Sequence, residues 1–401
     1  DALGATGETV EYIEPFQPNA ETLQSEQLAE LIKDIDAGTV KMLVIMGVNP
    51  VYNTPIDQKL NGERMAKIET TVHLGEHFDE TGFVSKWHIS GKHYLESWGD
   101  SRAFDGTATL VQPLVKPLYG GKNASEVVQL FFKENFDKKD IDIVKDYWQK
   151  LDFTIAPMKT AVKEATAPAA PEKNAKVTPE TTPEATPAAA PVPAVKPESA
   201  NGDSAPKNFE DKWRKVVHDG FIAGTQASSK SVSVTTAFLS ETEETASGNG
   251  DLEIAILPDP CVYDGSYTNN GWLQELPNPL NKVTWENVAL ISPNTAKKLG
   301  INQDKRYDDY AGGELGRAFI TTKGGNMESD FVEITYQDGK IEKAAPAWIT
   351  PGQPDDVITI FLGYGRNRAG KVGNNIGYNA YEARKSDAMW FGKGSVKKRE
   401  G

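Results

Sequence analysis

Histidines gather in one part of the chain and are the first residues to consider for chemistry. His73, His77, His88 and His93 lie close together, and His73 and His77 have the i, i+4 spacing that places two side chains on one helical face. The intervening Leu74-Gly75-Glu76 disfavours a helix and gives no HExxH motif. Because a metal site needs ligand number and geometry together, we interpret these histidines as structural and predict no metal site.

A group of charged residues follows the histidines. Glu96, Asp100, Arg102 and Asp105 could form a charged network. Paired carboxylates can act as general acid and base, but neither a nucleophile nor a pKa-tuning environment accompanies them. Structural ion-pair clusters mimic active sites. We therefore favour a structural network and predict no catalytic residue.

Three loops could bind a ligand. Two are glycine-rich, Gly363–Gly370 and Gly373–Asn379, and their backbone amides could cradle a phosphate. Solvent-exposed turns have the same composition, so both interpretations stay open. The third loop, GVNPVYNTP at 47–55, follows a predicted strand, where α/β proteins often bind ligands. It lacks the spaced glycines of a dinucleotide-binding loop, which excludes NAD, and an ordinary turn is the other interpretation.

Composition narrows the class of protein. The chain has 401 residues, enough for two or three domains, with 38 % hydrophobic residues and a net charge of −14. This negative charge argues against binding to nucleic acids, whose phosphates require a basic surface, and against binding to anionic lipid. The single cysteine, Cys261, cannot form an internal disulfide or hold an iron–sulfur cluster, which needs about four thiolates. We expect it to be buried.

The ends of the sequence suggest a piece of something longer. The chain begins DALGATGETV without a methionine, so we expect a processed product or an internal segment. The last ten residues, Gly392 to Gly401, are basic and contain glycine, and we interpret them as a connection rather than a closing element. No apolar run approaches the roughly 20 residues that span a bilayer.

The first part of the chain alternates helices and strands. Leu28, Leu31, Ile32 and Ile35 recur at helical spacing, and Gly38 ends that helix. The pattern then predicts a strand at 41–46, a helix from Pro55 to about Ile68, a strand at 70–74, and helices at about 125–134 and 140–151. This alternation is typical of an open α/β domain.

The middle of the chain changes character. Residues Ala165 to Lys207 hold nine of the 24 prolines and no aromatic residue. Such a segment buries too little apolar area to offset its ordering entropy, so we expect a disordered or polyproline-II-like linker or insertion, and the first site of proteolysis.

Short strands dominate the last part of the chain. A helix is marked by Phe209, Trp213, Val216 and Val217, and strands separated by Gly, Asp and Asn turns follow it. This pattern indicates a barrel or sandwich. The predicted strands are 232–239, 252–257, 288–291, 317–322, 331–336, 347–349 and 357–361.

The stretch from Tyr263 to Ile301 carries the strongest local signals for its backbone conformation. Asn269-Asn270-Gly271 is a turn signal, and Trp272, Leu273 and Leu276 after it offer large apolar surface. Ser292 is suited to cap a short helix that ends at Gly300. The stretch reads as a covering loop, either a packed structural loop or the wall of a cofactor groove.

Five motifs together resemble the molybdopterin oxidoreductase superfamily. They are GVNPVYNTP (47–55), KWHISGKHYLESWGD (86–100), QPLVKPLYGG (112–121), NNGWLQELPNPLNKVTWENVALISP (269–293) and PGQPDDVITIFLGYGRNRAG (351–370). The sequence of the fourth motif is most similar to that of the large iron–sulfur subunit of bacterial alternative complex III. The resemblance covers most of the chain outside Ala165–Lys207.

This resemblance implies a fold and a domain division. The chain would be the C-terminal half of a molybdoenzyme-like module: part of a Rossmann-like open α/β domain at 1–164, the linker at 165–207, and a helix with a double-psi β-barrel at 208–401. The iron–sulfur clusters would belong to a following domain of the same polypeptide.

The resemblance also implies a function. The chain would be a non-catalytic scaffold, without a cofactor of its own, in a complex that passes electrons from quinol to a cytochrome c or an oxidase. It would lie on the periplasmic face of the bacterial inner membrane. Its partners would be a multihaem cytochrome c, polysulfide-reductase-type membrane subunits that bind quinol, and monohaem cytochrome or lipoprotein subunits.

Two other hypotheses remain. The chain could be a fragment of an active molybdopterin-dependent oxidoreductase, and Asn270, Trp272, Arg366 and Asn375 are then the residues expected to contact the pterin. A soluble periplasmic binding protein is the third hypothesis.

Overall fold

The computed structural model describes residues 3–14, 22–151, 208–233, 250–301 and 329–399, apart from 338 and 342. Contacts divide the chain into two compact units. The first comprises 1–99, 111–144 and 228–401, and the second 100–110 and 145–227. The predicted linker Ala165–Lys207 and the predicted strand 317–322 lie outside the described residues. So does the predicted strand 232–239 beyond residue 233, and its described part is not a strand. The predicted domain division stays a prediction.

A three-stranded parallel sheet opens the first unit. Its order is β1 (Met42–Met46), β2 (Thr70–Gly75) and β3 (Trp87–Ser90), with Val44 opposite Val72 and Leu74 opposite Ile89. The predicted strands at 41–46 and 70–74 are confirmed, as is the helix before them, α1 (Gln24–Asp36). The buried side chains between this sheet and its helices are Ile32, Ile35, Ile45, Leu60, Met65 and Ile68.

The helix predicted from Pro55 to Ile68 is wrong. The chain instead forms α2 (Pro50–Asn53), the short 3-10 helix η1 (Ile56–Gln58) and α3 (Gly62–Ala66). Asn61 interrupts the run because its side chain accepts a hydrogen bond from the Arg64 amide and starts a new helix there. The strand-end loop at 47–55 is therefore partly helical.

Short helices complete this part of the first unit. They are α4 (Glu80–Val84), η2 (Tyr94–Glu96), α5 (Ala124–Gln129), η3 (Lys133–Asn135) and the beginning of α6 (Asp140–Lys150). The helix predicted at 125–134 ends early, since α5 stops at Gln129, and the one at 140–151 is confirmed within a residue. Asp140 accepts from Lys92, which also pairs with Glu126, so this segment is held by a partly buried ion pair.

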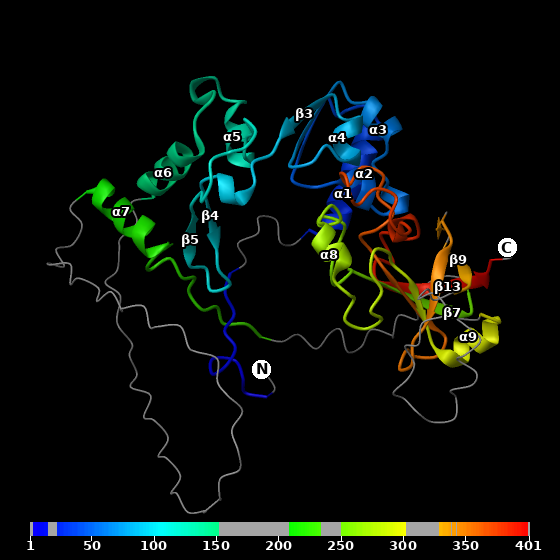
Figure 1. Ribbon diagram of the computed structural model, residues 1–401. Coiled ribbons are helices and arrows are strands. Elements are labelled where there is room, and N and C mark those ends of the chain that lie inside the picture. Colours follow the sequence, from blue (N-terminus) through cyan, green and yellow to red (C-terminus); the bar gives the residue numbers. More distant parts are fainter. Residues whose placement is uncertain are drawn as a thin grey trace, which may run out of the picture. The chain divides into compact units, whose positions relative to one another are not determined.

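Among the described residues of the first unit, six strands close into a barrel. Figure 1 shows three of them, β7, β9 and β13, side by side. Around the barrel the order is β9 (Phe331–Tyr336), β11 (Ala345–Ile349), β8 (Ala289–Ile291), β12 (Val357–Phe361), β7 (Leu252–Leu257) and β13 (Phe391–Lys398), which pairs again with β9. β10 (Gly339–Lys340) adds a short hairpin to β9. Pairs β11–β8 and β12–β7 are parallel and the other pairings are antiparallel.

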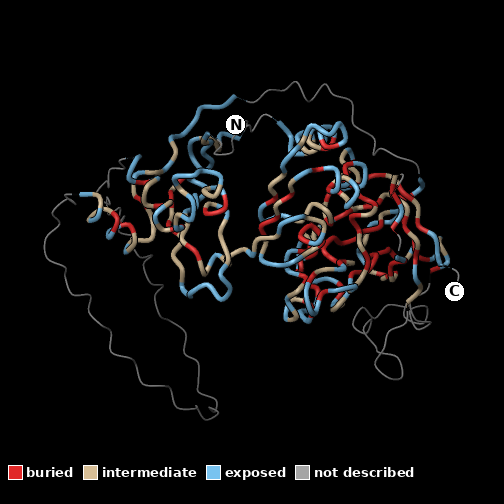
Figure 2. The backbone as a smooth tube through the Cα atoms, turned by 90° about the horizontal axis from the view of Figure 1, so that it is seen from above, coloured by how far each residue is buried: buried red, intermediate tan, exposed pale blue. Residues whose placement is uncertain are grey.

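The barrel interior is the main hydrophobic core. Figure 2 shows buried residues gathered along its strands. Ile254, Ile256, Ile334, Ile358 and Ile360 are each at most 1 % exposed. The mixed α/β architecture and the barrel agree with the fold class expected from the sequence, and its double-psi form stays a prediction.

The strand β13 corrects the interpretation of the C-terminal run. Residues 392–401 were expected to be a connection, but Phe391–Lys398 closes the barrel between β7 and β9. Gly392, Gly394 and Val396 face inward in alternation. A Cβ on Gly394 would lie 2.5 Å from the Thr335 carbonyl oxygen, so glycine is needed where the strand passes close to its neighbour.

Two helices flank the barrel strands. α8 (Gly271–Glu275) lies in the covering stretch, and α9 (Pro293–Leu299) follows β8. Both ends of α9 are as predicted: the Ser292 side chain accepts from the Thr295 amide, and Gly300 is left-handed with φ 66°. The 3-10 helix η6 (Ala380–Glu382) precedes β13.

The second unit is small. It holds most of the sheet β4 (Gly99–Arg102), β5 (Ala108–Val111) and β6 (Phe221–Ile222), and α7 (Phe209–Asp219), whose Trp213 and Val216 are buried. The Trp148 indole donates to Asp100 at 2.8 Å. No helix in the described part of the chain is long and apolar enough to cross a membrane.

Candidate functional site

A cavity of about 930 Å³ opens at the carboxyl ends of the parallel strands β1 and β2. On one side lie the residues that follow these strands, including Asn49 and Glu76. On the other lies the covering stretch, Asp264–Tyr267 and Asn269–Trp272. Ligands bind at this edge in open α/β sheets, and the volume is that of a small-molecule site. It is therefore the candidate site.

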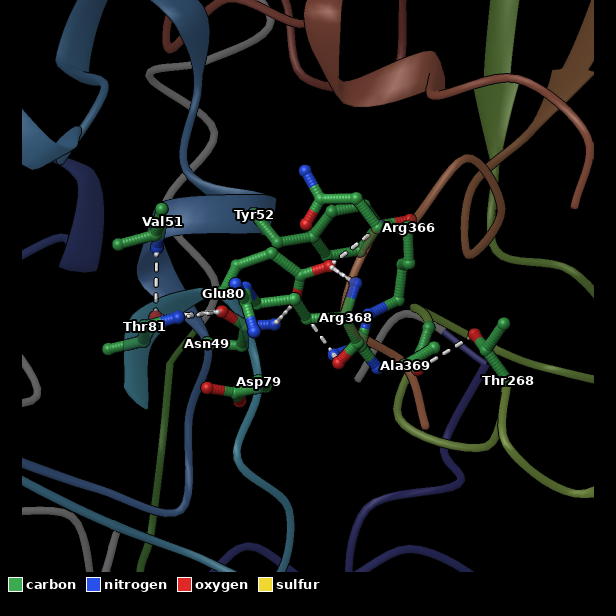
Figure 3. Close-up of polar contacts among 12 residues, drawn as sticks. Asn49, Val51, Tyr52, Asp79, Glu80, Thr81, Thr268, Arg366, Arg368 and Ala369 are labelled. Carbon is green, nitrogen blue, oxygen red and sulfur yellow. Dashed lines mark hydrogen bonds and ion pairs between the residues drawn. The ribbon is translucent and has the colours of Figure 1, made fainter. Parts of the chain in front are cut away.

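A buried carboxylate, Glu80, lies beside this cavity and accepts four hydrogen bonds. Its Oε1 accepts from the backbone amides of Asn367 at 3.0 Å and Arg368 at 2.9 Å. Its Oε2 accepts from Arg366 Nη2 and from Asn49 Nδ2, each at 2.8 Å (Figure 3). We call this arrangement the Glu80 clasp. It ties α4, beside the sheet, to the loop that follows β12.

Both charges of the clasp are removed from water. Glu80 is 8 % exposed and Arg366 is 5 % exposed. Burial alone would raise the pKa of Glu80, but the hydrogen bond and positive charge of Arg366 outweigh burial and lower it. The carboxylate is therefore ionised at neutral pH and neutralises the guanidinium.

A helix cap and long-range hydrogen bonds place the members of the clasp. Asp79 caps α4 by accepting from the Gly82 amide at 2.8 Å, which sets Glu80 in the first turn. The Asn49 amide oxygen accepts from both the amide and hydroxyl of Thr81, which joins the two strand-end loops. Arg366 also donates to the Gly265 carbonyl at 2.8 Å, and its guanidinium lies over the Tyr52 ring.

Three of the four residues expected to contact a pterin lie at this cavity. Asn270, Trp272 and Arg366 line it, whereas the Asn375 amide donates to the Arg366 carbonyl and braces the loop. The Asn270 side chain caps α8, and Trp272 is 86 % exposed. The structure thus brings together residues that are about one hundred positions apart.

The first glycine-rich loop, 363–370, does hold an anion, but the anion is a side chain of the same chain. The amides of Asn367 and Arg368 are bonded to Glu80, and that of Ala369 donates to Asn374 Oδ1 at 2.7 Å. The Gly365 amide donates to the Ile376 carbonyl. These amides are therefore not available to a phosphate.

These observations test whether a molybdopterin group, which carries phosphate, fits here. The Arg366 guanidinium is already neutralised by Glu80, and the cavity wall carries the carboxylates Glu76, Asp79 and Asp264. A polyanion would meet net negative charge and few free cationic donors. The described lining therefore offers a phosphate-bearing cofactor little positive charge, although Arg366 Nε is buried without a hydrogen-bond partner.

The other candidate residues fall in different places. His73 Nδ1 lies 3.0 Å from His88 Nδ1, while His93 accepts from the Leu95 amide. His73, His77 and His93 line the cavity. Within the described ranges, no group of three or more His, Cys, Asp or Glu residues is placed to hold a metal ion. Cys261 is buried.

The four residues of the predicted charged network each have a hydrogen-bond partner. Glu96 accepts from the amides of His93 and Leu118, and Asp105 from the amide and hydroxyl of Thr107, so these two cap turns. Arg102 donates to the Gly106 carbonyl, and Asp100 accepts from the Trp148 indole.

Sequence reasoning missed Glu80. The one local signal was the Asp79-Glu80 pair before a short apolar run, which is typical of a helix start. The functional partner is distant, because Arg366 lies 286 positions further along the chain.

Comparison with known proteins does not identify a family for this chain. No protein-family model matches the chain, and no curated protein matches it. Among solved structures, acetylene hydratase from Pelobacter acetylenicus is similar with a TM-score of 0.47 and 12 % sequence identity, over 93 % of this chain and 46 % of that chain. The chain thus spans less than half the length of that protein.

Proposed function

We propose that this chain is a non-catalytic, molybdoenzyme-like scaffold in the iron–sulfur subunit of a quinol-oxidising respiratory complex of the alternative complex III type. The barrel would have the double-psi form and the parallel sheet would belong to a Rossmann-like domain. Three of the motifs that carry the resemblance meet at one cavity: 47–55 follows β1, 269–293 contains α8, and 351–370 contains β12 and the loop that holds Glu80.

The Glu80 clasp is the observation that carries the non-catalytic part of the proposal. Its carboxylate takes up the guanidinium and the two loop amides that an anionic cofactor would require. Four hydrogen bonds and a buried ion pair make this arrangement rigid. A region built in this way joins two parts of a module without holding a reactive group.

The partners follow from the same proposal. Iron–sulfur clusters would be held by another domain of the polypeptide, and a multihaem cytochrome c and polysulfide-reductase-type quinol-binding subunits would assemble with it. Monohaem cytochrome or lipoprotein subunits would complete a complex on the periplasmic face of the bacterial inner membrane.

Purification tests the assembly. The full-length protein is tagged in its native organism and extracted from membranes with mild detergent. It is expected to copurify with haem-c-containing subunits, and the purified complex is expected to reduce a cytochrome when quinol is added. Recovery of the protein in the soluble fraction without haem would contradict the proposal and favour a periplasmic binding protein.

The alternative is a fragment of an active molybdopterin-dependent oxidoreductase. The position of the cavity favours it, because a bound group is expected at the carboxyl edge of a parallel sheet. The two functions differ in whether the complete protein contains a pterin.

A further inference from the structure

Two imidazoles that touch lie behind the cavity. His73 Nδ1 and His88 Nδ1 are 3.0 Å apart, and the ring centroids are separated by 5.1 Å. His73 is 1 % exposed, and His88 is half-buried with Phe78 against its ring. The two residues are direct neighbours in the pairing of β2 with β3, so the sheet fixes their separation.

This geometry allows one proton between the two Nδ1 atoms. One ring must donate and the other must accept, because two N–H groups cannot point at each other at this distance. A second proton, added to whichever Nδ1 accepts, would break the pair.

Burial opposes protonation of the pair, and the charge of Asp79 favours it. Asp79, on α4, is the nearest carboxylate, with Oδ1 3.8 Å from His73 Nε2, and it is already bonded to the Gly82 amide. Glu80 on the same helix faces Arg366. Lys86, which leads into β3, donates to the Ile68 and Glu69 carbonyls. Glu76 and His77 line the cavity on the loop after β2.

The pair is mechanically joined to the Glu80 clasp through α4. A Cβ on Gly82 would lie 3.0 Å from His73 Nδ1 and 3.1 Å from His88 Nδ1, so this helix rests on the two facing nitrogens. The same short helix carries Glu80. If the rings separate, the residues that hold the clasp must move with them.

We propose that the His73–His88 pair is a proton-responsive lock, which opens the Glu80 clasp when both imidazoles become protonated. Burial lowers the pKa of both histidines, and the neighbouring His73 lowers that of His88 further, so opening falls on the acidic side of neutrality. Glu80 keeps its charge at this pH because its own pKa is lowered from 4.5. The lock depends on the proposed scaffold function in one respect: the contact that it opens is the Glu80 clasp.

Hydrogen exchange of the purified full-length chain tests this proposal. Peptides covering α4 and 363–370 are followed by mass spectrometry between about pH 7.5 and about pH 5, with correction for the intrinsic exchange rate. The opening constant is expected to rise by up to about tenfold per pH unit for each proton taken up. His88→Asn cannot titrate, and its amide can donate to a neutral His73 or, after rotation, accept from a protonated one, so its opening constant should stay flat.

The controls separate the lock from general acid effects. His218→Asn changes a histidine that is paired with Asp219 on α7 and should leave the response unchanged. An equal response in His88→Asn and the unaltered chain would overturn the proposal. If His88→Asn does not fold, histidine NMR titration of the unaltered chain decides: two independent titrations near the ordinary value of about 6.5 would also overturn it. The copurification result can fail without affecting either readout.

Discussion

Replacing Glu80 by glutamine should strongly destabilise the first unit. Glutamine keeps the shape of the side chain but offers one acceptor oxygen instead of two, and its NH₂ group would face two of the four donors. The Arg366 charge would also lose its partner in a site that is 5 % exposed.

The size of this effect follows from the burial of the pair. Breaking a buried ion pair by removing one partner costs about 3–5 kcal/mol, and a buried donor without an acceptor costs about 1–3 kcal/mol. Some relaxation and water entry are expected at the cavity, so we expect Glu80→Gln to lower the free energy of unfolding by about 3 kcal/mol. Such a loss is large compared with the typical stability of a domain.

Urea unfolding at neutral pH, followed by tryptophan fluorescence, measures the change. The matched control is Glu333→Gln, which removes one partner of an ion pair with Lys340 of the same 2.8 Å length but with exposed side chains. This control should have no measurable effect. Arg366→Gln and the double variant complete a cycle, in which the combined loss should be smaller than the sum of the single losses. Equal midpoints for Glu80→Gln and Glu333→Gln would refute the reasoning.

Two further predictions concern the packing of the barrel and the loss of stability at acidic pH. Gly394→Ala should lower the free energy of unfolding by about 1–3 kcal/mol, because the added methyl group would meet the Thr335 carbonyl and the Ile254 side chain. The control is Gly120→Ala, whose added methyl group meets nothing within 4 Å, and equal urea midpoints for the two variants would show that β13 does not close the barrel. The lowered pKa of Glu80 contributes stability that is present above its ordinary value of 4.5 and is lost as pH falls towards the folded-state pKa. Glu80→Gln should lack this part of the acid transition, and identical pH profiles would contradict the assignment.

Local signals in the sequence predicted much of the fold. The helix α9 was predicted residue by residue, because Ser292, Pro293 and Gly300 each act within one turn. The strands β7, β9 and β12 were predicted from their apolar runs. Signals of this kind depend on neighbouring residues, so they need no knowledge of the tertiary structure.

Features that depend on distant contacts were missed. The strand β13 contains Gly392, Gly394 and lysines, which are poor strand formers, and it forms because β7 and β9 provide partners on both sides. The interruption at Asn61 was missed because a side-chain cap inside a polar stretch gives a weak signal. These elements are determined by tertiary context rather than by propensity.

The candidate site was predicted in part. The loop at 47–55, the turn at Asn270 and Arg366 were each singled out, and they meet at one cavity. What the sequence could not reveal is that Glu80 occupies the Arg366 guanidinium and the loop amides. That interaction joins residues 286 positions apart, and neither the phosphate cradle nor the exposed turn considered from the sequence includes it.

Cofactor analysis of the complete protein, purified from its native membrane, tests the central claim most directly. Molybdenum and tungsten are measured by mass spectrometry, and pterin by fluorescence after oxidative release, each as moles per mole of polypeptide. The Glu80 clasp predicts values near zero for both metals and for pterin. One pterin or more per chain, together with molybdenum or tungsten, would contradict the account and identify a working oxidoreductase.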